Sequence, residues 1–214
     1  MTKPELLAYI RVLVSDTVPE YNTSDTFINK YIDEAEREGA ERSLYLKTDS
    51  SFDINITAGI SDYNIDESII FIERLKINGA VKPLIKTTKR ELDFQKTSWE
   101  LDVATDPAYP VYYFQERNKI TLYPIPANSY TLLVDASRRP IYSMETPEEL
   151  HESLAYWAVY RILINPDVDI YSPKAAFDNK KLFEAAFGMK RTAWFDDLNR
   201  NLSMSSSMEP NPFN

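Results

Sequence analysis

The chain has 214 residues, with 24 Lys and Arg against 33 Asp and Glu, which gives a formal net charge of -9. The content of 43% hydrophobic and 27% charged residues is that of a folded globular chain, and the length suits one domain or one domain with a sizeable insertion. The acidic balance argues against binding that depends on neutralising phosphates. The absence of cysteine excludes disulfides, thiol nucleophiles and cysteine zinc sites.

Glycine and apolar patterning exclude two further classes. The four glycines lie too far apart for either glycine-rich nucleotide loop. The longest apolar run, about residues 154–160, is far shorter than the roughly 20 residues that span a bilayer. The opening MTKPELLAYIRV has an apolar stretch too short for a signal peptide. The sequence therefore predicts no membrane partner and synthesis in the cytosol.

Two helical patterns open the chain. Thr2 and Glu5 fit a capping box, and apolar residues at helical spacing follow, so a helix is expected over residues 3–15. A second helix is expected to begin at residue 24 or 25 and to run to about residue 46.

The middle of the chain has the pattern of short strands. Residues 52–56 alternate between apolar and polar, as a half-buried strand does. The pair Asn78-Gly79 is typical of a type I′ turn and predicts a hairpin between residues 69–77 and 81–85. Further strands are expected over residues 111–115, 120–123 and 130–137. Residues 86–106 are polar and match no element.

Helical character returns after residue 145. Thr146 is expected to be the N-cap, Pro147 the first helical residue and Glu149 the partner in a second capping box. The helix that follows is apolar almost all round over residues 155–164, which predicts that it lies at the centre of the core. A last helix is expected from Ser172-Pro173 onward.

These elements predict an α+β fold. We expect a four-helix bundle made of two N-terminal helices (residues 1–48) and two C-terminal helices (146–198), with an inserted antiparallel β subdomain (49–145). Residues 199–214 have no periodicity and are expected to form a flexible, extended C-terminal arm.

The sequence offers little for catalysis or metal binding. His151 has no Ser side chain on its own helix face, so a surface or capping role is expected. Asp167 and Asp169, or Asp62 with Asp66 and Glu67, can in principle hold a hard cation, but neither spacing matches an EF-hand loop. We therefore expect no catalytic residue, no metal and no cofactor.

Aromatic and apolar residues are the stronger candidates for binding. Tyr112, Tyr113 and Phe114 can stack on a sugar or a protein partner, although alternating aromatics on a strand also suit a sheet core. The arm carries spaced apolar residues that can anchor on a partner surface, with an idle tail as the alternative. These anchors are Leu202, Met204, Met208, Pro210, Pro212 and Phe213.

The order of several segments resembles the head-to-tail adaptor (connector) proteins of tailed bacteriophages. The segments are YIDEAEREGAERS, INITAGISDYNI, ITLYPIPA, PEELHESLAYWAVYRI and AAFDNKKLFEAAFG, which together span most of residues 5–190. Each is a structural pattern rather than a catalytic signature, and it is their order that carries the resemblance.

The resemblance implies a virion protein of the neck, made in the host cytoplasm. It implies a ring of about twelve subunits that joins the portal protein to a tail or nozzle protein, with genomic DNA passing through without specific binding. The arm is then expected to contact the portal, and Asn78, Gly79, Tyr112 and Tyr113 to lie on the tail side.

Two other functions stay open at this point. A carbohydrate- or receptor-binding module on the β subdomain predicts that the isolated protein binds sugars. A metal-dependent enzyme that uses the loop carboxylates predicts activity that a chelator removes.

Overall fold

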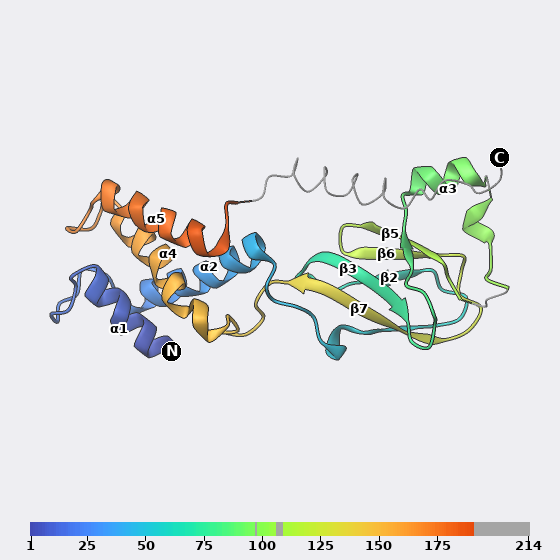
Figure 1. Ribbon diagram of the computed structural model, residues 1–214, viewed down its shortest axis with the longest axis horizontal. Coiled ribbons are helices and arrows are strands. Elements are labelled where there is room, and N and C mark those ends of the chain that lie inside the picture. Colours follow the sequence, from blue (N-terminus) through green and yellow to red (C-terminus); the bar gives the residue numbers. More distant parts are fainter. Residues whose placement is uncertain (97, 106–108, 191–214) are drawn as a thin grey trace. The chain divides into compact units, whose positions relative to one another are not determined.

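The computed structural model describes residues 1–96, 98–105 and 109–190 (Figure 1). These residues form five α-helices, three 3-10 turns and seven strands. They divide into two compact units. We call residues 1–46 with 138–190 the helical unit, and residues 47–137 the β unit.

The helical unit contains four helices, which are α1 (Lys3–Leu13), α2 (Asp25–Ser43), α4 (His151–Leu163) and α5 (Pro173–Phe187). The predicted capping box of α1 is confirmed, because the Glu5 amide donates to Thr2 Oγ1 and the Thr2 amide donates to Glu5 Oε2 at 2.7 Å. The side chain of Ser24 caps α2 by accepting from the Phe27 amide. The local signals in the sequence therefore place both helix starts correctly.

The core of the helical unit lies between α2 and α4, with α1 and α5 on opposite sides of this pair (Figure 1). The prediction that the helix around Trp157 lies at the centre is confirmed, because α4 packs against α1, α2 and α5. Gly39 on α2 allows a close approach: a Cβ there would lie 3.0 Å from the Phe187 ring of α5.

The start of α4 differs from the prediction. Residues Glu148–Leu150 form a 3-10 turn, and α4 begins only at His151, so the predicted capping box of Thr146 and Glu149 is wrong. The Thr146 hydroxyl instead lies 2.9 Å from Glu36 Oε1 of α2 and 2.7 Å from the Tyr45 hydroxyl. A buried carboxylate 110 residues away competes for the hydroxyl, and a local pattern cannot reveal it.

The β unit contains two sheets. One has the strand order β1-β7-β3, with strands Ile54–Ile56, Tyr130–Arg138 and Ile69–Ile77. The other has the order β2-β6-β5-β4, with strands Asp62–Asn64, Lys119–Tyr123, Tyr112–Glu116 and Ile85–Lys86. Apolar residues of both sheets share one core, which includes Leu75, Ile120 and Leu132.

The predicted hairpin after β3 is wrong. The chain does turn at Asn78-Gly79, where the Ala80 amide donates to the Ile77 carbonyl at 3.0 Å. Only Gly79 has a positive φ, of 83°, whereas a type I′ turn needs positive φ at both central residues. Pro83 then lacks the amide that a returning strand needs, and β4 joins the other sheet, parallel to β5.

The predicted α+β class is confirmed, but the predicted four-helix bundle with one inserted antiparallel β subdomain is wrong. A fifth helix, α3 (Lys89–Gln95), belongs to the β unit, which holds two sheets and a parallel pair of strands. A capping box of Thr88 and Glu91 starts α3. The helix buries only Leu92, so no apolar periodicity marks it in the sequence. The predicted arm and its six anchors lie outside the described residues.

Candidate functional site

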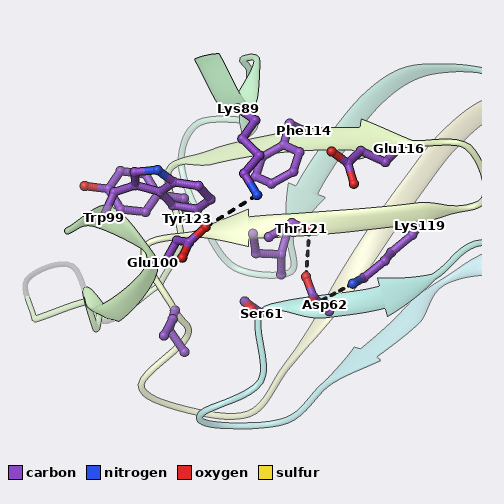
Figure 2. A pocket seen from close by; sticks show the side chains of 12 residues that line it. Ser61, Asp62, Lys89, Trp99, Glu100, Phe114, Glu116, Lys119, Thr121 and Tyr123 are labelled. Atoms are coloured by element: carbon purple, nitrogen blue, oxygen red, sulfur yellow. Dashed lines mark hydrogen bonds and ion pairs between the residues drawn. The ribbon is translucent and has the colours of Figure 1, made fainter. Parts of the chain in front are cut away.

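The four-stranded sheet carries a pocket of about 240 Å³ on one face (Figure 2). Strands β2, β5 and β6 supply most of its lining. Helix α3, the 3-10 turn Trp99–Leu101 and the residues Ser61 and Ile125, outside the strands, supply the rest. The lining residues are Ser61, Asp62, Lys89, Trp99, Glu100, Phe114, Glu116, Lys119, Thr121, Leu122, Tyr123 and Ile125. We call this the sheet pocket.

Three aromatic rings form one side of the sheet pocket. Trp99 meets Phe114 and Tyr123 edge to face, with ring centroids 5.7 and 5.8 Å apart. The Trp99 indole N–H donates to Asp93 Oδ1 at 2.8 Å, and the side chain is only 5% exposed. The burial of Trp99 disfavours the stacking of a sugar on its ring.

The charged groups of the sheet pocket pair with one another. Asp62 pairs with Lys119 at 2.7 Å and accepts from the Thr121 hydroxyl at 2.6 Å (Figure 2). Partial burial by itself raises the pKa of Asp62, but hydrogen bonds from Lys119 and Thr121 outweigh it and hold the pKa below its usual range. Lys89 and Glu100 form a second pair at 3.4 Å. The charges of these four groups are thus balanced within the sheet pocket.

A second, apolar pocket of about 240 Å³ lies beside the Asn78-Gly79 turn. Its lining residues are Ile77, Ala80, Val81, Lys82, Pro83, Leu84, Tyr109, Pro110 and Val111. Both turn residues are exposed, and a Cβ added to Gly79 would meet no atom within 4 Å. The exposed turn therefore lies next to an apolar hollow.

The predicted tyrosines of β5 separate in the structure. Tyr113 is 3% exposed and packs in the core of the β unit, where burial raises the pKa of its hydroxyl to about 12. Tyr112 is half-buried and stacks on Tyr123 at 6.1 Å between ring centroids. Of the residues expected on the tail side, Asn78 and Gly79 are thus exposed, Tyr112 is partly exposed and Tyr113 is buried.

His151 lies inside the helical unit rather than on its surface. Its Nε2 is 2.7 Å from the Thr146 carbonyl oxygen, so the tautomer protonated at Nε2 donates to that carbonyl. No hydrogen bond joins Nδ1 to another described residue. The side chain therefore fastens the segment before α4 and has no Ser or Asp partner of the kind a catalytic triad needs.

The loop carboxylates do not gather. Asp66 accepts from the Ser68 amide at 2.8 Å, and the Asp167 amide donates to the side chain of Asn165. Within residues 1–96, 98–105 and 109–190, no three His, Asp or Glu side chains are grouped so as to hold a metal ion. No helix in those ranges is long and apolar enough to cross a membrane.

Comparison with known proteins identifies the family. A family model described as SU10 adaptor protein matches residues 1–206, which is almost the whole chain. No curated protein is significantly similar to the chain. The match confirms the resemblance that the order of the sequence segments indicates. The chain belongs to the SU10 adaptor protein family and is a structural adaptor protein of a bacteriophage.

Proposed function

We propose that the chain is a ring-forming head-to-tail adaptor of the virion neck, which joins the portal protein to a tail or nozzle protein and continues the DNA channel. The family match over residues 1–206 carries this proposal. About twelve copies of a chain with net charge -9 would give a ring a charge of roughly -100, which repels DNA and lets it slide.

The sites of the β unit support a binding role. The sheet pocket offers paired charges, and the pocket beside Asn78-Gly79 offers an apolar hollow. Protein interfaces combine apolar contact with a polar rim in this way. We therefore place the tail contact at the Asn78-Gly79 turn, with Tyr112 of the other sheet, which follows the pocket residue Val111, and with Tyr113 as support in the core.

The contact with the portal is proposed for residues 199–214. Their apolar side chains are separated by serine, asparagine and proline, a composition that orders on a partner rather than alone. In this proposal residues 1–48 and 146–198 build the ring, residues 49–145 reach the tail, and the arm holds the portal.

Deleting residues 202–214 is expected to leave the fold nearly unchanged and to weaken attachment, because the deletion removes Leu202, Met204, Met208, Pro210, Pro212 and Phe213 together. Thermal unfolding of the purified chain measures the first effect, and cryo-electron microscopy of particles measures adaptor occupancy at the portal vertex. Filled heads that lose their DNA are expected.

A matched control replaces Ser205, Ser206 and Ser207 by Ala, which keeps the length of the arm and every apolar anchor. The control is expected to retain normal occupancy. Normal occupancy in the deletion as well would show that the arm is dispensable.

A further inference from the structure

The helical unit has two edges of different character. Helix α1 packs on α2 and α4 from one side, and α5 packs on the same pair from the other side (Figure 1). Each of these outer helices therefore turns one face away from the core of the unit. We call these faces, with the charged residues beside them, the α1 edge and the α5 edge.

The α5 edge combines apolar and basic side chains. Its outward positions, at helical spacing, are Lys174, Asp178, Lys181, Leu182 and Ala185. Leu182 is 50% exposed, a large fraction for a leucine on an ordered helix. Residues 173–190 hold four lysines against two acidic residues, although the whole chain carries a charge of -9. Three of these lysines form ion pairs, Lys180 with Glu184, Lys181 with Asp178 and Lys190 with Glu38 of α2. Even with Glu38 counted, the lysines outnumber the carboxylates by four to three, so the α5 edge keeps a small basic excess on an acidic protein.

The α1 edge combines apolar and acidic side chains. Ala8 and Val12 point outward on α1, and Val12 is 62% exposed. Four exposed carboxylates lie at the starts of α1 and α4, those of Glu5, Glu148, Glu149 and Glu152. The amino group of Met1 binds Glu148 at 2.7 Å, which holds the N-terminus of α1 next to the start of α4.

The directions of the helices decide which parts of the two edges lie at the same end of the helical unit. Met1 contacts Glu148, and the charge of Glu152 acts on Tyr9, so α1 and α4 run the same way. Helix α5 follows α4 after a short loop and runs back along it. The carboxylates of the α1 edge and the C-terminal half of α5, with Lys181 and Lys190, therefore lie at the same end of the helical unit.

We infer that the α1 edge of one copy packs against the α5 edge of the next copy. This inference rests on the proposed function, since it names the contact that builds the ring. A ring of identical subunits needs two different, complementary surfaces on each chain. Contact of α1 with α5 brings carboxylates to the lysines of the C-terminal half of α5, and it brings Val12 to the N-terminal half, where Phe177 is 50% exposed. Contact of α5 with a second α5 would instead oppose lysines to lysines.

Disulfide trapping tests the inference. Because the chain has no cysteine, only the introduced thiols of the chain can form disulfides. The double variant Ala8→Cys with Ala185→Cys puts one thiol on each edge. In complexes isolated with the portal protein, mild oxidation is expected to join copies into a ladder of covalent oligomers on non-reducing gels. Each single variant is expected to stay monomeric, since a contact between two different surfaces never brings the same position together.

Lys30→Cys, on the exposed face of α2, combined with Ala185→Cys is the matched control and is expected to give no ladder. Dimers from Ala185→Cys alone would overturn the inference, as would a ring on the portal that gives no ladder in the double variant. A ring on the portal that gives no ladder would leave the proposed function intact. A complex that contains no ring would overturn both.

Charge reversal provides a second measurement. Lys181→Glu is expected to raise the concentration needed for ring assembly about tenfold at low salt. The change replaces an attraction to the neighbouring α1 edge by a repulsion, and it leaves Asp178 without its ion-pair partner Lys181, which makes the α5 edge acidic. Glu152→Lys in the same chain is expected to restore assembly. Equal assembly of Lys181→Glu and the unchanged chain at low salt would contradict the inference.

Discussion

Glu36→Ala is expected to lower the free energy of unfolding by about 3 to 5 kcal/mol, because it leaves buried donors without their acceptor. Glu36 on α2 is 1% exposed. Its carboxylate accepts from the Met144 amide at 2.8 Å, the Thr146 amide at 3.1 Å and the Thr146 hydroxyl at 2.9 Å. One side chain thus fastens the segment before α4 to α2.

Urea unfolding followed by far-UV circular dichroism measures this loss. Glu34→Ala is the matched control, because Glu34 lies on the same helix in a partly exposed ion pair with Arg161. Such a pair is worth about 1 kcal/mol or less. Equal losses in the two variants would show that the buried hydrogen bonds of Glu36 do not hold the segment.

Trp157→Ala is expected to cost about 3 to 5 kcal/mol, because it opens a cavity where three helices meet. Trp157 is 6% exposed, its ring centroid lies 5.0 Å from that of Phe183, and the Arg42 guanidinium lies 5.2 Å from it. The same unfolding experiment measures the loss. Phe177→Ala removes an aromatic ring that is half exposed, and it is expected to cost less than about 1 kcal/mol.

His151→Ala separates a structural role from a catalytic one. The change leaves the buried Thr146 carbonyl without its donor, so a loss of about 1 to 3 kcal/mol is expected. A variant that assembles with the portal like the unchanged chain supports the structural role. Loss of a measurable activity with unchanged stability would instead revive the enzyme hypothesis.

Elements with local signals were predictable from the sequence. Helices α1 and α2 begin directly after Thr2 and Ser24, because the side chain of each of these N-cap residues accepts from the amide three residues on. The pairing of strands depends on residues far away in the chain, and β4 joined an unexpected partner for that reason. Helix α3 had the capping residues of a helix but no apolar stripe, so its polar segment resembled a loop.

The candidate site was harder to predict. A strand that is buried on both faces shows no alternation of apolar and polar residues in its sequence. Tyr113 and Phe114 are neighbours on β5 and point to opposite faces, yet both are buried, Tyr113 against the main core and Phe114 against Trp99 and Leu92. The helical turn that supplies Trp99 lies in the segment without a pattern. The sequence therefore indicated aromatic residues at this sheet but not which of them a partner can reach.

Sedimentation velocity of the purified chain, alone and mixed with the portal protein, tests the adaptor proposal most directly. Alone, the chain is expected to sediment as a monomer of 24.8 kDa or a weakly associating species. With portal present, the complex is expected to gain about 300 kDa, the mass of about twelve chains. A stable ring formed by the chain alone would contradict assembly on the portal, and a portal that gains no mass would contradict the adaptor function itself.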